Sequence, residues 1–322
     1  MSLPALSPLS LGTAPLGGLY QPVNENDALA VIDSAWQHGI RFFDTAPMYG
    51  NGSAERRLGL ALRDKPRDSY VLATKVGRLL RLPHSPQGED AYYKDTPPER
   101  PIFDFSYDGV MRSFEESLIR LGLDRIDILH IHDPDSHELE AMKGAYQALD
   151  RLRTEGLIRA IGAGMNQWEM LARFAEAGKF DCFLLAGRYT LLDQSALKTL
   201  LPICERRGVR IIVGGVYNSG LLADPKPGAK FNYDDAPSEL IERAQKLDSV
   251  CRSHGVPLKA AAIQFPALHS AVASILTGAR SVMELDENVA MTKVPIPSAL
   301  WNDLKIQGLI DEGAPISKRI TV

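Results

Sequence analysis

Four side chains that together could move a proton follow three short apolar, β-branched stretches of this sequence. Asp44 and Tyr49 follow the first stretch, Lys75 ends the second, and His132 ends the third. A tyrosine titrates near pH 10 in water, at about the value for a free phenol, so a neighbouring ammonium group must stabilise its phenolate at neutral pH. Lys75 can supply that charge, and Asp44 can hold Lys75 in place. His132 can orient a substrate oxygen by hydrogen bonding, which completes a predicted proton-transfer site.

Strand and helix patterns that would position these side chains alternate along nearly the whole chain. Strand candidates are short apolar runs at 9–12, 41–44, 70–75, 126–130, 160–163, 181–186, 209–214 and 270–276. Amphipathic helix candidates lie at 25–38, 54–62, 107–121, 143–154, 167–177, 198–207, 238–254 and 281–289. Continuous apolar strands are typical of a parallel sheet covered by helices. About eight such units predict one (β/α)8 TIM barrel domain over residues 1–322, with the four side chains at the C-terminal mouth.

Glycines follow the helical runs at positions where a left-handed C-cap is expected. They are Gly39, Gly122, Gly156, Gly178 and Gly208. A glycine adopts the left-handed conformation without steric cost, so each predicts the end of a helix before the next strand.

Two long loops, 78–106 and 217–237, interrupt the pattern after the predicted strands 3 and 7. The first holds the aromatic residues Tyr92, Tyr93, Phe103 and Phe105. Loops of this length inside a compact domain are commonly functional, and both follow strand C-terminal ends. We therefore expect at least one of them to cover a ligand.

Composition and charge narrow the classes of protein. The 322 residues include 36 Lys plus Arg and 40 Asp plus Glu, a net charge of −4, which gives no broad basic surface for nucleic acid. No apolar run approaches the roughly 20 residues of a membrane span, and the N-terminal segment lacks the basic region of a signal peptide. We expect a cytoplasmic protein that binds neither nucleic acid nor membrane, and no feature indicates an oligomeric state.

The motifs around the four side chains resemble those of the aldo-keto reductase family. The resemblance rests on Gly39-Ile-Arg-Phe-Phe-Asp-Thr-Ala-Pro-Met-Tyr-Gly-Asn-Gly, Leu72-Ala-Thr-Lys-Val-Gly and Leu121-Gly-Leu-Asp-Arg-Ile-Asp-Ile-Leu-His-Ile-His-Asp-Pro, and it covers nearly the whole chain. It implies hydride transfer between a nicotinamide cofactor and a carbonyl or alcohol, without a metal. By this resemblance Tyr49 donates or accepts the proton, and Asp44 and Lys75 tune it. His132 helps to place the substrate.

The resemblance also implies contacts to the nicotinamide and the pyrophosphate. Asn166 matches the Asn of a Ser-Asn pair that holds the carboxamide, although the Ser is absent here. Tyr217 stands near the position of the aromatic residue that stacks on the nicotinamide. Ser219, Gly220 and Leu221 resemble the loop that lies over the pyrophosphate.

Near the C-terminus, Gly278, Arg280, Glu287 and Asn288 resemble the family's adenosine-binding segment. Arg280 would meet a phosphate, and Glu287 and Asn288 would hydrogen-bond to the adenine. Many NADP-dependent members carry an Arg four residues before the Asn, where this chain has Glu284. A carboxylate there would repel a 2′-phosphate, so the resemblance implies NAD, with NADP as the alternative.

Segments 159–166, 184–192 and 216–222 resemble a sugar-oxidising branch of the family. This implies oxidation of C1 of a cyclic aldose, of the L-fucose, D-threo-aldose or L-galactose type, to the lactone, with Tyr49 as general base. Arg188 adds to the polar character that suits a sugar. Pyridoxal is the alternative substrate, because its hemiacetal is also a cyclic lactol that is oxidised to a lactone, 4-pyridoxolactone, and the aromatic loop could stack on its ring.

Two further alternatives come from other classes of protein. A metal-dependent barrel hydrolase could use His130 and His132, whose spacing places both on one strand face. Lys75 would repel the metal cation, which argues against it. The other alternative is a non-catalytic, cofactor-sensing subunit, against which the intact set of four catalytic side chains argues.

Overall fold

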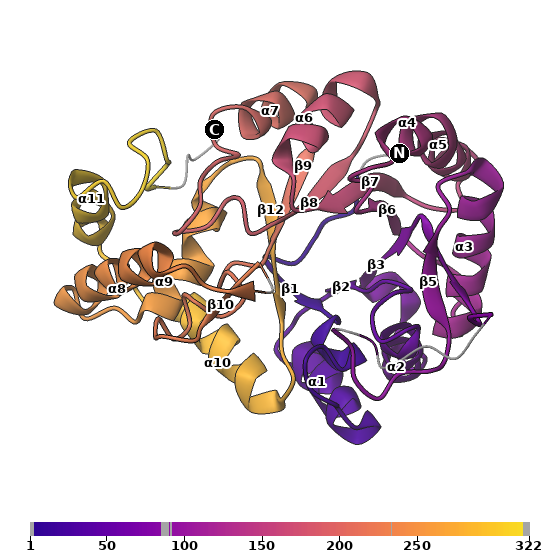
Figure 1. The fold of residues 1–322 in the computed structure, drawn as a ribbon, viewed down its shortest axis with the longest axis horizontal. Coiled ribbons are helices and arrows are strands. Elements are labelled where there is room, and N and C mark those ends of the chain that lie inside the picture. Colours follow the sequence, from indigo (N-terminus) through magenta and orange to yellow (C-terminus); the bar gives the residue numbers. More distant parts are fainter. Residues whose placement is uncertain (1–2, 85–89, 91, 233, 318–322) are drawn as a thin grey trace.

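Eight parallel strands close into a barrel in the computed structural model, which describes residues 3–84, 90, 92–232 and 234–317. Around the barrel the order is β1 (Leu9–Gly12), β12 (Val272–Gly278), β9 (Arg210–Gly214), β8 (Cys182–Ala186), β7 (Ala160–Met165), β6 (Ile128–His132), β3 (Val71–Val76) and β2 (Phe42–Asp44) (Figure 1). The predicted (β/α)8 barrel is confirmed. Three strands end two residues later than predicted, at positions that bear on the site: β6 at His132, β7 at Met165 and β12 at Gly278.

Helices follow the strands and cover the outside of the barrel (Figure 1). Those predicted from periodicity are α1 (Glu25–Gln37), α2 (Ser53–Leu62), α3 (Tyr107–Leu121), α5 (Tyr146–Thr154), α6 (Trp168–Ala177), α7 (Leu200–Arg207), α8 (Ser238–Ser253) and α10 (Val282–Lys293). Periodicity missed α4 (Glu138–Glu140), α9 (Leu258–Gln264) and α11 (Ser298–Ile306). The helix predicted over 143–154 begins within the π-helical turn η3 (Ala141–Ala145), which continues into α5. The helix α9 is buried almost all round, so it shows no polar face for a helical period to reveal. No helix within the described ranges is both long and apolar enough to span a bilayer.

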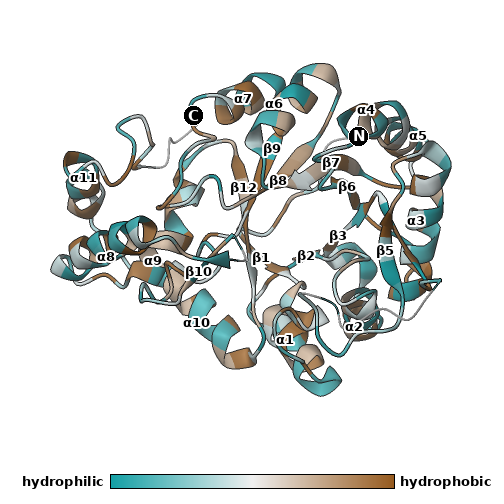
Figure 2. Ribbon diagram, viewed as in Figure 1, coloured by the Kyte–Doolittle hydropathy of each residue, from teal (hydrophilic) through white to brown (hydrophobic). Residues whose placement is uncertain are grey.

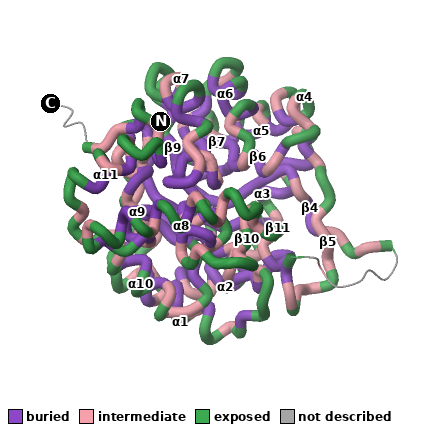
Figure 3. The backbone as a smooth tube through the Cα atoms, turned by 60° about the vertical axis from the view of Figure 1, so that its left-hand side comes forward, coloured by how far each residue is buried: buried purple, intermediate pink, exposed green. Residues whose placement is uncertain are grey.

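Alternation along the strands decides which side chains enter the barrel. Phe42, Ala73 and Ile128 belong to an apolar cluster inside it, whereas their neighbours Phe43, Leu72 and Leu129 belong to the layer between strands and helices. Hydrophobic residues are concentrated along the barrel strands and alternate with hydrophilic residues along the helices (Figure 2). The segments at the centre of the fold are buried (Figure 3). Because side chains on a strand alternate, residues two or four positions further on share the inner face. Asp44, Lys75, His130 and His132 therefore all point into the barrel.

Both long loops contain short antiparallel pairs. In the first, β4 (Arg78–Arg81) pairs with β5 (Arg100–Phe103), beside α3 at the rim of the barrel (Figure 1). In the second, β10 (Lys230–Phe231) pairs with β11 (Asp234–Asp235). Positions 85–89 and 91 of the first loop, and 233 of the second, lie outside the described residues.

Four of the five predicted helix-ending glycines have a left-handed backbone, and Gly178 does not. Gly39, Gly122, Gly156 and Gly208 have φ angles between 62° and 82°. Gly178 has φ −136°, so the prediction of a left-handed cap there was wrong. A Cβ on Gly178 would lie 2.9 Å from the rings of Phe180 and Tyr146. Glycine is required there because two aromatic rings approach the backbone closely.

Candidate active site

Asp44 and Lys75 form a buried ion pair at the inner face of β2 and β3. Lys75 Nζ donates to Asp44 Oδ1 at 2.5 Å and to the carbonyl oxygen of Thr45 at 2.9 Å. Burial raises the pKa of Asp44, and the Lys75 ammonium opposes that rise. The second carboxylate oxygen, Oδ2, has no hydrogen-bond partner within the described part of the chain. The pair therefore holds a positive charge at a fixed point below the mouth of the barrel.

Tyr49 and His132 stand next to this charge. Lys75 Nζ lies 4.6 Å from the centre of the Tyr49 ring, and the His132 ring meets the Tyr49 ring edge-on with centroids 5.8 Å apart. The ring of Tyr93, from the first long loop, lies beside the Tyr49 ring, with the two centroids 6.2 Å apart and the planes tilted by 31°. The four side chains predicted to act together thus lie together, although they come from three strands or strand ends.

Two glycines hold the backbone of Tyr49 in place. Gly50 has φ +59°, and a Cβ on Gly17 would lie 2.7 Å from the carbonyl carbon of Tyr49 and from the amide nitrogen of Gly50. The short helix η1 (Pro15–Gly17) therefore packs directly on the turn that carries Tyr49. Any larger side chain at these positions would displace that turn, since the atoms it meets are backbone atoms.

His132 is neutral in this environment. Burial lowers the pKa of His132 well below its usual value, and the charges of Arg78 and Lys75 lower it further. A neutral imidazole carries one donor and one acceptor nitrogen, so it can donate to a carbonyl oxygen or accept from a hydroxyl group. This suits a residue that orients a substrate oxygen.

His130 lies deeper on the same strand face, and we expect it to make the protein acid-sensitive. Burial lowers the pKa of His130 to about 3, and neither ring nitrogen has a hydrogen-bond partner among the described residues. Below about pH 6.5 the unfolded chain gains a proton at this residue that the folded chain does not. The free energy of unfolding therefore falls by up to about 1.4 kcal/mol for each unit by which the pH decreases. His130→Leu should remove this contribution. Urea denaturation of both proteins at about pH 7 and about pH 5 measures it, and an unchanged loss of stability in the variant would contradict the expectation.

Two charged residues that the sequence analysis did not single out flank His132. Asp133 Oδ2 lies 3.4 Å from His132 Nε2, and it forms an ion pair with Arg78 Nη2 at 2.9 Å. Asp133 directly follows the predicted catalytic histidine, so its place at a strand end was a usable signal. Arg78 carried no such signal, because it meets Asp133 only through the fold.

Small residues end three neighbouring strands opposite Lys75. The last inward positions of β7, β8 and β9 are Gly164, Ala186 and Gly214. A Cβ on Gly164 would lie 3.6 Å from Lys75 Cε, and a Cβ on Gly214 would contact Leu184. At these three inward positions the side chain is a hydrogen atom or a methyl group, which suits contact with a flat ring such as nicotinamide.

The residues predicted to contact the nicotinamide and pyrophosphate lie around this surface. Asn166 comes directly after β7, and Ser219, Gly220 and Leu221 lie in the loop after β9. Asn218, Ser219 and Gly220 have positive φ angles of 47°, 58° and 97°. The conformation is strained at Asn218 and Ser219, because they are not glycines. Asn218 Oδ1 is buried without a hydrogen-bond partner among the described residues. Such a strained loop with an unsatisfied polar atom fits a ligand-binding role.

The predicted adenosine segment is linked to the loop after β9. Tyr217 donates its hydroxyl hydrogen to Asn288 Oδ1 at 3.0 Å, and Asn288 Nδ2 donates to the Gly278 carbonyl oxygen at 3.4 Å. These bonds join the end of β12 to α10 and fix the Tyr217 ring beside them. The residues present therefore fit a dinucleotide laid from the mouth towards α10, with Tyr217 and Asn288 at one side.

The two charged residues of this segment already have partners. Arg280 pairs with Glu284 at 3.0 Å, and Glu284 also accepts from the Arg280 amide at 2.8 Å. Glu287 pairs with Lys259 at 2.7 Å. A ligand that used Arg280 or Glu287 would have to compete with these exposed ion pairs, which are individually weak.

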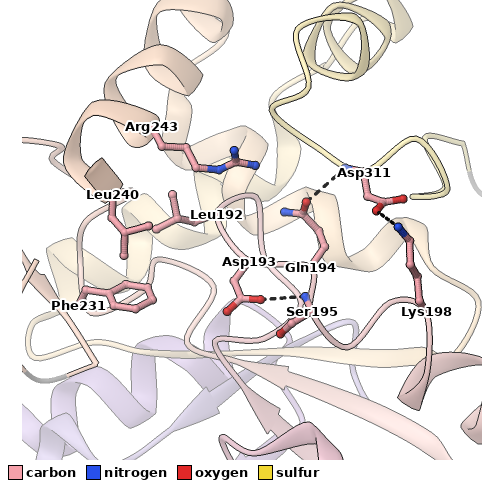
Figure 4. Close-up of a pocket in the computed structure, with 9 residues that line it drawn as sticks. All are labelled: Leu192, Asp193, Gln194, Ser195, Lys198, Phe231, Leu240, Arg243 and Asp311. Atoms are coloured by element: carbon pink, nitrogen blue, oxygen red, sulfur yellow. Dashed lines mark hydrogen bonds and ion pairs between the residues drawn. The ribbon is translucent and has the colours of Figure 1, made fainter. Parts of the chain in front are cut away.

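Two surface hollows are lined by other residues. One, of about 400 Å³, lies between the loop after β8, α8 and the C-terminal segment (Figure 4). There Lys198 pairs with Asp311 at 2.7 Å, and Gln194 accepts from the Asp311 amide at 3.3 Å, so its polar groups fasten the C-terminal segment to the barrel. The other, of about 520 Å³, is lined by Phe103, Phe105 and His137 among others. Within the described ranges, no three His, Cys, Asp or Glu side chains cluster as a metal site.

Comparison with known proteins agrees with this geometry. The model of the Aldo/keto reductase family matches residues 8–307. The chain is 45% identical to pyridoxal 4-dehydrogenase of Microbacterium luteolum, covering 94% of both chains, and 41% identical to D-threo-aldose 1-dehydrogenase of a Pseudomonas species, covering 95% of both. It superposes on the holo form of aldo-keto reductase AKR11C1 from Bacillus halodurans with a TM-score of 0.73, at 23% identity over 98% of this chain and 95% of the other. The chain therefore belongs to the aldo/keto reductase family and is an oxidoreductase enzyme.

Proposed function

We propose that this enzyme oxidises C1 of a cyclic aldose to the lactone. The observation that carries the proposal is the charged mouth around His132, where Arg78 and Asp133 offer a donor and an acceptor to a polyhydroxylated substrate. An apolar substrate would offer neither an acceptor to Arg78 nor a donor to Asp133, whereas the hydroxyl groups of a sugar can supply both. The 41% identity to a D-threo-aldose 1-dehydrogenase supports the same substrate class.

In the proposed reaction Tyr49 takes the proton of the anomeric hydroxyl group. The Lys75 ammonium, 4.6 Å from the Tyr49 ring, favours the phenolate electrostatically, and Asp44 keeps the ammonium in position. His132, being neutral, orients the anomeric oxygen by a hydrogen bond. The electron pair of the O–H bond then forms the C1=O bond of the lactone as the C1–H bond breaks.

The nicotinamide cofactor, when bound, accepts the hydride from C1. Gly164, Ala186 and Gly214 would form the surface under its ring, and Asn166 would hydrogen-bond to its carboxamide. Ser219, Gly220 and Leu221 would cover its pyrophosphate. Removal of one hydride and one proton from the lactol balances the reaction.

We propose NAD as the preferred form of the cofactor. Glu284 is held at the start of α10 by two hydrogen bonds with Arg280, so its negative charge neutralises the nearest arginine. A 2′-phosphate close to this pair would be repelled by the Glu284 carboxylate, and the Arg280 guanidinium is already paired with that carboxylate. A ribose hydroxyl would instead find an acceptor.

Pyridoxal is the second candidate substrate, and the 45% identity to a pyridoxal 4-dehydrogenase favours it. Two loop aromatics that could stack on a pyridine ring are engaged elsewhere. Phe103 and Phe105 stack on each other at 5.8 Å and on His137 at 4.9 and 5.2 Å, and Arg78 lies 4.8 Å over Phe103. Those contacts weaken the case for stacking of a substrate on Phe103 or Phe105, whereas Tyr93 of the same loop lies 6.2 Å from the Tyr49 ring.

A substrate panel tests the proposed function. L-fucose, L-galactose, D-arabinose and pyridoxal are each supplied with NAD and with NADP, and formation of the reduced cofactor is followed by absorbance. We expect kcat/KM to be highest for an aldose with NAD. A higher kcat/KM for pyridoxal than for every aldose would overturn the sugar assignment, and a preference for NADP would overturn the cofactor assignment alone.

A further inference from the structure

Asp133 has a strained backbone at the mouth of the barrel. Its φ angle is +42°, a left-handed conformation that is uncommon for residues other than glycine, although Asp and Asn tolerate it best. Its amide donates to the Gly164 carbonyl oxygen at 3.0 Å, which ties the end of β6 to the end of β7. Strain of this kind is commonly retained where it directs a functional side chain. Here it turns the carboxylate towards His132.

Arg78 holds the Asp133 carboxylate from the opposite side. Its Nη2 donates to Asp133 Oδ2 at 2.9 Å, and its guanidinium lies over the Phe103 ring and contacts Met48. Met48 precedes Tyr49, so the arginine spans the turn after β2 and the end of β6. Burial raises the pKa of Asp133 to about 6 even though Arg78 opposes the rise, because few donors solvate the carboxylate. A further donor, such as a substrate hydroxyl, would stabilise it.

The carboxylate lies where it would meet the carbon next to the reacting one. Asp133 Oδ2 is 3.4 Å from His132 Nε2, and a third of the Asp133 side chain is exposed (33%). His132 would bind the oxygen on C1, so an acceptor beside it faces a substituent on the neighbouring carbon. In an aldose that substituent is the C2 hydroxyl. The hemiacetal of pyridoxal has no hydroxyl on the carbon next to its reacting one.

We propose that Asp133, positioned by Arg78, accepts a hydrogen bond from the C2 hydroxyl and makes the enzyme specific for aldoses that carry it. This inference rests on the proposed function. Hydrogen bonds to charged groups are stronger than those between neutral groups, so a substrate that supplies this additional donor is favoured over one that lacks it. Arg78 is the positioning residue, and Asp133 is the group that touches the substrate.

The test pairs variants with matched substrates. The wild type, Asp133→Asn and Asp133→Gly are assayed with L-fucose and 2-deoxy-L-fucose, and Asp135→Asn is the control because its carboxylate is exposed two residues away. Asn and Gly both accept a positive φ, so neither variant should strain the backbone. L-galactose is included because it differs from L-fucose only at C6, so the ratio between these two sugars should not respond to Asp133.

In the wild type we expect kcat/KM for 2-deoxy-L-fucose to be about 10- to 100-fold below that for L-fucose. In Asp133→Gly, kcat/KM for L-fucose should fall, mainly because KM rises, and the kcat/KM values for L-fucose and 2-deoxy-L-fucose should become nearly equal. Asp135→Asn should keep the wild-type ratio. Equal rates for the two sugars in the wild type, or an unchanged ratio in both Asp133 variants, would overturn the inference while the aldose activity stands. Failure of the wild type to oxidise any of these sugars would overturn the proposed function itself and this inference with it.

Discussion

Replacing Tyr49 with phenylalanine is expected to lower kcat for the proposed dehydrogenase reaction about 1,000-fold. General acid–base catalysis by a positioned side chain contributes roughly 100- to 10,000-fold, and only the hydroxyl group is removed. The phenylalanine ring should keep the contacts with His132 and Tyr93, so the fold and the mouth should persist. Initial rates of reduced-cofactor formation with the best aldose of the panel measure the effect.

Tyr70→Phe is the matched control for this variant. Tyr70 is a buried tyrosine just before β3, and its hydroxyl has no hydrogen-bond partner among the described residues. We expect its kcat to stay within a few-fold of wild type. Cofactor binding, followed by quenching of protein fluorescence, should be the same for Tyr49→Phe and the wild type. A Tyr49→Phe enzyme with near wild-type kcat would refute the assignment of Tyr49 as general base.

Replacing Lys75 with methionine is expected to affect stability and activity together. Methionine fills the space but leaves the Asp44 carboxylate buried without its partner. Removal of one partner of a buried ion pair costs about 3–5 kcal/mol of unfolding free energy, because the remaining charge is not compensated. The loss of the ammonium beside Tyr49 should also reduce kcat by about 100-fold or more. Urea denaturation measures the first effect, and initial rates measure the second.

The double variant Asp44→Asn/Lys75→Met separates these two effects. It removes both charges, so no buried carboxylate is left without its counter-charge. We expect most of the lost stability to return while kcat stays low. If the double variant were as unstable as Lys75→Met, the unpaired carboxylate would not be the cause of the instability. If its activity recovered, the charge of Lys75 would not be needed for catalysis.

The arrangement of the catalytic side chains was predictable because it depends on local periodicity. Asp44 follows Phe42 by two positions, and Lys75 follows Ala73 by two. Since side chains two apart on a strand share a face, an apolar residue inside the barrel places the polar one above it inside as well. The repeated strand–helix pattern then brings the C-terminal strand ends to one mouth. The amphipathic helices were predictable for the same reason, whereas α9, apolar almost all round, was not.

The sequence by itself therefore determined the barrel and the strand positions of Asp44, Lys75 and His132, through patterns that repeat within a few residues. Only the tertiary structure decided which residues surround them. Arg78 meets Asp133 across 55 positions, and Tyr217 meets Asn288 across 71. Such contacts have no local pattern, because they depend on the path of the long loops and on the closure of the barrel. The catalytic centre follows from strand geometry, and the groups proposed to select the substrate follow from packing between distant segments.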